Sequence, residues 1–98
     1  ELVEKVGPHF YDRWDVSFDP SQRDAIEQSV RASFPSTLAG KTVVQVDERD
    51  GIRFVLESGH WSLIRFSGTE PLLRIYAEGE SPAEVAALLG EARAMTGV

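Results

Sequence analysis

The chain has 98 residues and no cysteine, so it is long enough for one domain, and a disulfide scaffold and thiolate metal sites are excluded. Its formal net charge of −6 argues against a nucleic-acid partner, because proteins that bind a phosphate backbone usually present clustered Lys and Arg. No apolar run approaches the roughly 20 residues that span a bilayer, and we expect a soluble, cytoplasmic protein without a membrane partner.

Residues 1–8 are predicted to be the tail of a helix from a preceding domain. The apolar positions 2, 3 and 6 share one helical face, and the pair Gly7-Pro8 ends the helix. Such a short helix is not stable alone, and the chain begins without Met, so we expect a segment of a larger protein. An expression boundary is the alternative. Residues 9–98 would then form the domain itself.

A strand and a helix follow. Residues 10–18 alternate loosely and are rich in aromatic side chains, which predicts a strand. Asp19 suits a helix N-cap, Pro20 suits the first helical position, and Pro35 ends the run. Apolar residues recur between them at four-residue spacing and should form one buried face; these are Ile26, Val30 and Phe34.

Four closely spaced strands are predicted after a loop at residues 36–40. They cover residues 42–47, 52–57, 61–66 and 72–78, and Gly51 and Gly59 lie in their hairpin-sized turns. Alternation predicts a face that is buried against helices, made of Ile52, Phe54, Leu56, Ile64, Phe66, Leu73, Ile75 and Ala77. The opposite face receives Leu63, Arg65, Arg74, Tyr76 and Glu78.

The last predicted element is a helix. Ser81 suits its N-cap, Pro82 its first turn, and Glu84 would complete a capping box with Ser81. An apolar stripe follows at helical spacing, formed by Val85, Leu88, Leu89, Ala92 and Met95. The order β-α-β-β-β-β-α predicts an α+β fold, a two-layer sandwich with two helices on one face of an antiparallel sheet.

Residues 65–78 form an unusual hairpin in which a polar loop separates two apolar strands. The loop offers hydroxyls, a glycine that permits close backbone approach, and amides that suit an anion-binding nest; its residues are Ser67, Gly68 and Thr69. Arg65 and Arg74 flank it on the same side of the sheet, and Arg provides the bidentate geometry that phosphate accepts. The alternative is an ordinary surface turn beside two arginines that pair with carboxylates.

The whole string RxSGTEPxxRxYxE at residues 65–78 resembles the phosphate-binding signature of the α-D-phosphohexomutases, which include phosphoglucomutase, phosphomannomutase and phosphoglucosamine mutase. The order of elements is similar to that of the family's fourth, C-terminal domain, which has a TBP-like fold. By position the resemblance implies that five residues bind the sugar phosphate, namely Arg65, Ser67, Gly68, Thr69 and Arg74. Glu70 and Pro71 are expected to shape the loop.

The resemblance implies a parent isomerase that moves a phosphoryl group on glucose or mannose phosphate through a hexose 1,6-bisphosphate intermediate. Its phosphoryl-carrying serine, its DxDxD loop for Mg²⁺ and its sugar-reading loop belong to preceding domains, which are expected partners. None of these motifs is found in residues 1–98. We therefore expect no catalytic residue, no metal ligand and no cofactor of this domain's own.

Three alternative interpretations, two of polar residues and one of the whole chain, are weaker. The acidic run at residues 47–50 lacks the alternation of a metal loop and suits a solvated turn. His60 and Ser67 might suggest a hydrolase, but no GxSxG elbow surrounds the serine. A free-standing anion-binding or regulatory module without catalysis is the main alternative for the whole chain, and the upstream reading frame would separate the two.

Overall fold

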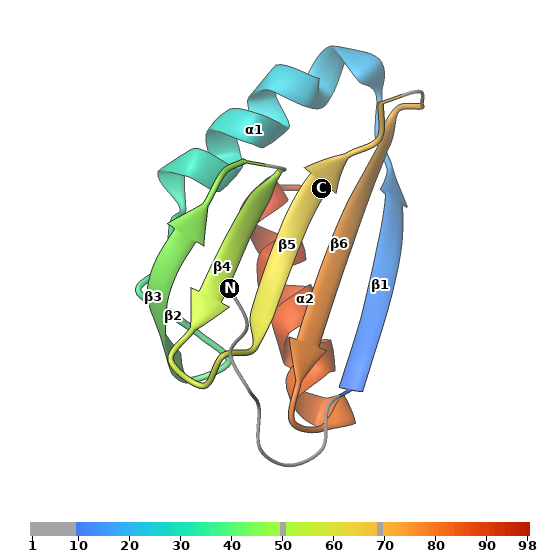
Figure 1. Ribbon diagram of the computed structural model, residues 1–98. Coiled ribbons are helices and arrows are strands. Elements are labelled where there is room, and N and C mark those ends of the chain that lie inside the picture. Colours follow the sequence, from blue (N-terminus) through green and yellow to red (C-terminus); the bar gives the residue numbers. More distant parts are fainter. Residues whose placement is uncertain (1–9, 50, 69) are drawn as a thin grey trace.

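A six-stranded antiparallel sheet organises the domain. The computed structural model describes residues 10–49, 51–68 and 70–98, and its strand order is β1-β6-β5-β4-β3-β2 (Figure 1). The strands are β1 (Phe10–Ser17), β2 (Thr37–Leu38), β3 (Lys41–Asp47), β4 (Ile52–Leu56), β5 (Trp61–Phe66) and β6 (Leu72–Gly79). The long strands follow the predicted ranges closely. The predicted boundary between residues 8 and 9 lies outside the described residues.

The strand β2 is an addition to the predicted order, because residues 36–40 were expected to form a loop. Thr37 and Leu38 pair with the first residues of β3. The connection consists of Ala39 and Gly40, whose φ angles are 50° and 80°. Two positive φ angles in a two-residue connection are typical of a tight hairpin turn. A two-residue strand is too short to show a periodic pattern, and alanine is unusual at positive φ. The sequence therefore does not predict β2.

Both helices lie on one face of the sheet, as predicted (Figure 1). The first is preceded by a 3₁₀ turn, η1 (Pro20–Gln22), which Asp19 caps by accepting from the Ser21 N–H at 2.9 Å, and it continues as α1 (Arg23–Ala32). The second, α2 (Pro82–Thr96), begins behind Ser81 and ends at Gly97 in the left-handed conformation. No helix in the described part of the chain is long and apolar enough to cross a membrane.

The core lies between the sheet and the helices. The strand residues predicted for this face are buried, except Phe66, which is half-buried at the end of β5. Ile26 and Val30 from α1 and Leu88 and Leu89 from α2 complete the same cluster. The α+β sandwich is therefore confirmed, and the face of β5 and β6 that points away from the helices is left for other contacts.

Aromatic side chains gather on that outer face. Tyr11 on β1 lies with its ring centroid 6.3 Å from that of Trp61 and 6.5 Å from that of Tyr76. The guanidinium of Arg53 stacks on Trp61, 4.9 Å from the ring centroid. Leu63, expected on this face, is paired in register with Arg53 and Tyr76 and is only 6% exposed. The outer face is thus partly apolar rather than uniformly wet.

A buried carboxylate fixes the end of β6 that lies away from the hairpin loop. Glu84 in α2 is 9% exposed, and its Oε2 lies 2.7 Å from Lys41 Nζ. Its Oε1 accepts from the Glu80 N–H at 2.7 Å. Ser81 Oγ accepts from the Glu84 N–H at 3.1 Å, as the predicted capping box requires. The Glu84 carboxylate, however, bonds to the Glu80 N–H and to Lys41 and not to the Ser81 backbone.

Gly79 makes this arrangement possible, because a Cβ at that position would lie 2.7 Å from Glu84 Oε1. Burial raises the pKa of Glu84, and the hydrogen bonds from Lys41 and from the Glu80 N–H lower it by more. The net pKa is therefore below the ordinary value of 4.5. A carboxylate that is more acidic when folded stabilises the fold only while it is ionised.

Glu84→Gln should lower the free energy of unfolding by about 1 to 3 kcal/mol at neutral pH, the range for hydrogen bonds to charged groups. Because folding lowers this pKa, the stabilisation is complete above the unfolded value and is lost as the pH falls through the folded value. Urea denaturation should show the gap between parent and variant shrinking below the ordinary pKa of 4.5.

Glu80→Gln is the matched control. The Glu80 side chain is 61% exposed, and its Oε1 lies 3.4 Å from the same Lys41 Nζ. An exposed pair of this kind contributes at most about 1 kcal/mol, and we expect a change within about 0.5 kcal/mol. A gap for Glu84→Gln that stayed constant from pH 7 to pH 3 would contradict the ionic role of the carboxylate.

Candidate functional site: the β5–β6 hairpin loop

The candidate site is the loop that joins β5 and β6. Arg65 and Arg74 are directly paired across the two antiparallel strands, on the face away from the helices. Directly opposed residues have Cβ atoms about 4.5 to 5.5 Å apart, so the two side chains leave the sheet as neighbours. Two guanidinium groups side by side repel each other unless a negative charge lies near them, and Asp15 on β1 is paired in register with Arg74. The structure thus brings together the two arginines that the sequence singled out.

Arg74 carries a donor without an acceptor. Its Nε is buried and finds no hydrogen-bond partner in the described part of the chain. A buried donor left unpaired costs about 1 to 3 kcal/mol. The side chain as a whole is half-buried, so a ligand at its exposed end can still reach it. This unpaired donor makes Arg74 a candidate ligand-binding residue.

The backbone bonds of the loop decide which amides are available. The Ser67 N–H donates to the Leu72 carbonyl at 2.8 Å and closes the hairpin, so this N–H is not available to a ligand. The Leu72 N–H donates to the Glu70 carbonyl at 2.7 Å, which makes a tight turn at Pro71. The Gly68 N–H donates to no acceptor among residues 10–49, 51–68 and 70–98. Thr69 lies outside the described residues.

Gly68 is exposed to solvent, and its backbone conformation does not require a glycine. Its φ is not in the left-handed region, and a Cβ built on it meets no described atom within 4 Å. Neither backbone strain nor internal packing therefore explains a glycine here. A ligand that approaches the backbone closely would explain it, because a side chain at this position would stand in its way.

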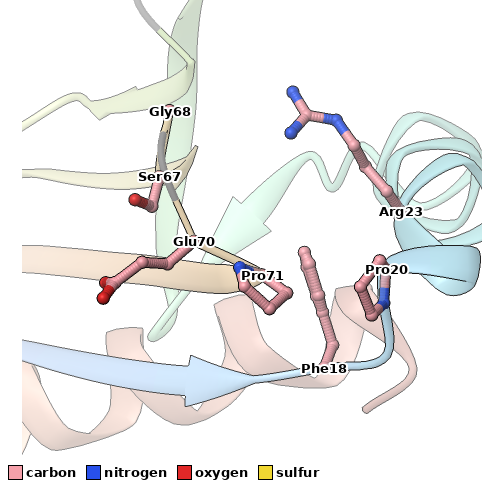
Figure 2. A pocket seen from close by; sticks show the side chains of 7 residues that line it. All are labelled: Phe18, Pro20, Arg23, Ser67, Gly68, Glu70 and Pro71. Carbon is pink, nitrogen blue, oxygen red and sulfur yellow. The ribbon is translucent and has the colours of Figure 1, made fainter.

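A pocket of about 250 Å³ lies beside the loop on the side of the helices. Figure 2 shows its lining residues, which are Phe18, Pro20, Arg23, Ser67, Gly68, Glu70 and Pro71. Phe18 ties its two walls together, because its N–H donates to the Pro71 carbonyl at 3.2 Å and its ring lies 5.6 Å from that of Phe66. The segment before α1 thus holds both ends of the loop.

Arg23 is the member of this pocket that sequence reasoning missed. It opens α1, and its guanidinium carbon lies 4.4 Å from the centroid of the Phe66 ring, one residue before the loop. In Figure 2 its guanidinium faces Gly68 across the pocket. No motif includes this arginine, and only the fold of the chain places the start of α1 beside the loop.

In the acidic run at residues 47–50, the side chains of Asp47 and Glu48 form ion pairs with arginines. Arg49 Nη2 lies 2.6 Å from Asp47 Oδ2, and hydrogen bonds from Arg49 hold the pKa of Asp47 far below its usual range. Glu48 Oε1 lies 2.5 Å from Arg31 Nη1, and Asp50 lies outside the described residues. No group of three or more acidic or histidine side chains in the described ranges could hold a metal ion, so we assign none of these residues to Mg²⁺.

His60 and Ser67 do not form a catalytic pair. They lie at opposite ends of β5, with the whole strand between them. His60 is 3% exposed, and its Nδ1 is 3.1 Å from Ser58 Oγ within the turn that joins β4 and β5. Residues 58–60 therefore belong to a hairpin turn.

The comparison with known families decides what this loop belongs to. The profile described as "Phosphoglucomutase/phosphomannomutase, C-terminal domain" matches residues 19–95. The chain belongs to this family. The match includes α1, the arginine pair and the whole β5–β6 loop.

Curated relatives point to the same family. The chain is 33% identical over 81 residues to a probable phosphoglucosamine mutase of Methanothermobacter thermautotrophicus, covering 83% of this chain and 18% of the relative. It is also 33% identical over 81 residues to a phosphoglucomutase/phosphomannomutase of Thermococcus kodakarensis, covering 83% of this chain and 16% of that protein. The chain thus spans less than a fifth of the length of these relatives.

Gly68→Ala should separate binding from stability in this phosphohexomutase-family domain. The free energy of unfolding should stay constant or rise by about 0.4 to 1 kcal/mol, because alanine restricts the unfolded chain. The affinity for inorganic phosphate, measured by NMR titration, should fall about tenfold or more, since one charge-assisted hydrogen bond contributes about 1.5 kcal/mol or more.

Gly90→Ala is the control for this experiment. Gly90 lies within α2, and a Cβ there also meets nothing within 4 Å among the described atoms. The change should stabilise the domain by about 0.8 to 1 kcal/mol through helix propensity and leave phosphate binding as it was. Equal affinities of the Gly68→Ala variant and the parent would show that no ligand approaches this backbone.

Proposed function

We propose that this domain binds the phosphate group of a phosphosugar, glucose or mannose phosphate, for a parent mutase that moves a phosphoryl group between the 1- and 6-positions of the hexose. The membership of the chain in the family and the mutase names of its relatives support a phosphosugar ligand. The pairing of Arg65 with Arg74 beside the loop is the observation that carries the proposal.

A phosphate group suits this arrangement better than a carboxylate does. Its oxygens accept several donors at once, and each guanidinium can offer two parallel N–H groups. The Ser67 hydroxyl, the Gly68 N–H and Thr69 would add donors from the loop, and the half-buried Arg74 would offer the exposed end of its guanidinium. Glu70 and Pro71 give the loop its shape rather than contacts to the ligand.

The domain contributes position, and the bond-making groups lie elsewhere in the parent. By holding a phosphate that is distant from the reacting centre, it supplies remote binding energy and fixes the orientation of the sugar. Contacts confined to phosphate are indifferent to which end of a hexose 1,6-bisphosphate presents it. The intermediate can therefore turn over and be held again by the same residues. Mg²⁺ and the phosphoryl-carrying serine are assigned to preceding domains, the partners of this one.

Arg74→Ala should abolish phosphate binding and leave the fold intact. In the parent chain we expect a dissociation constant around the millimolar range, equivalent to about −4 kcal/mol, because a few charge-assisted bonds must offset the cost of association. NMR shifts on phosphate addition should centre on residues 67–69 and disappear in the variant.

Arg53→Ala is the control, because Arg53 lies on the same outer face, on β4, and stacks on Trp61. Its removal should leave phosphate affinity unchanged. The proposal fails if phosphate perturbs the turn at residues 47–51 instead, or if the Arg74→Ala variant binds phosphate as tightly as the parent.

The 98-residue chain alone should have no mutase activity. The described residues hold no group suited to Mg²⁺, and the contact between Ser58 and His60 lies in the β4–β5 turn, at the other end of β5 from the loop, so a hexose phosphate would be held and not converted. A coupled assay of glucose 1-phosphate conversion, with glucose 1,6-bisphosphate and Mg²⁺ supplied, should give the rate of the buffer. Turnover by the purified chain would place catalytic groups in this domain.

A further inference from the structure

We infer that Arg23 is a third arginine of the phosphate site, which reaches the anion from the helix side of the loop while Arg65 and Arg74 reach it from the outer face. This inference rests on the proposed phosphate-binding function and adds a residue outside the motif. It also means that part of the ligand's phosphate group would occupy the pocket between the loop and α1.

The geometry of the two faces leads to this assignment. Arg65 and Arg74 leave the sheet on its outer face, whereas Phe66, the last residue of β5, points toward the helices. The Arg23 guanidinium lies over the Phe66 ring, 4.4 Å from its centroid, and forms one wall of the pocket whose other wall is Ser67 and Gly68. Figure 2 shows the Arg23 guanidinium on the pocket side of Gly68, and the register of β5 and β6 puts Arg65 and Arg74 on the outer face.

Among the described residues, no carboxylate is paired with Arg23. No ion pair or hydrogen bond joins its guanidinium to another side chain in the described ranges. Arg31 in the same helix differs, since its Nε lies 3.4 Å from Glu27 and its Nη1 lies 2.5 Å from Glu48. Nor does helix stability favour Arg23, because a cation in the first turn opposes the helix dipole.

The size and lining of the pocket fit a phosphate group. A water molecule takes about 30 Å³ of liquid volume, so a pocket of about 250 Å³ has room for a phosphate and ordered water. The floor is apolar, formed by Phe18, Pro20 and Pro71, and Gly68, whose N–H donates to no acceptor in the described ranges, also lines the pocket.

The test is an NMR titration of the 98-residue chain with inorganic phosphate, in variants of Arg23. Arg23→Met keeps an apolar stem over Phe66 and removes the charge, and Arg23→Lys keeps the charge. We expect phosphate affinity to fall about three- to tenfold in Arg23→Met, less than a full charge-assisted bond because the group is exposed, and less than twofold in Arg23→Lys. Arg31→Ala, which removes a charge from the same helix, should leave affinity unchanged.

The outcomes are distinct. If Arg23→Met binds phosphate like the parent while Arg74→Ala does not, the role of Arg23 is wrong and the proposed function stands. If affinity falls equally in Arg23→Met and Arg31→Ala, only the net charge matters and the inference also fails. If Arg74→Ala retains full affinity, the proposed function itself is wrong. Urea denaturation of each variant shows whether a loss of binding reflects a loss of fold.

Discussion

The register between β5 and β6 is the constraint on which the core and the site both depend. It pairs Ile64 with Ile75 toward the helices and, one residue along, Arg65 with Arg74 toward the outer face. Side chains alternate with a period of two, so a slip of β6 by one residue against β5 would bury Arg74 and expose Ile75. Burial of the apolar pair thus fixes the position of the charged pair. No attraction between the two arginines is needed to hold them side by side.

The loop between these strands is held by a segment that is distant in sequence. Phe18 contacts the loop at both ends, through the ring of Phe66 and the carbonyl of Pro71, and Arg23 stacks on the same Phe66 ring. The order of the sheet makes this possible, because β1 pairs with β6 and ends beside the loop. The start of α1 consequently lies next to residues that follow it by more than forty positions in the chain.

The sequence was sufficient where the signals are local. Alternation predicted the four central strands, and Asp19 and Ser81 predicted the helix starts to within a few residues. The pairing of Arg65 with Arg74 followed from a hairpin with a short loop. Arg23 and the contacts of Glu84 could not be foreseen, because each depends on which elements meet in three dimensions. The two-residue strand β2 was missed because it is too short to show a period.

Stability and binding are placed at opposite ends of β6. The buried Glu84 and its partner Lys41 lie where the strand ends, and the loop lies where it begins. Eight extended residues separate the two by roughly 25 Å, about three screening lengths at physiological salt. The net charge of −6 therefore does not decide what the loop attracts. The proposed phosphate ligand would instead be attracted by local positive charge at the loop, which comes from the paired Arg65 and Arg74 and from Arg23 beside Phe66.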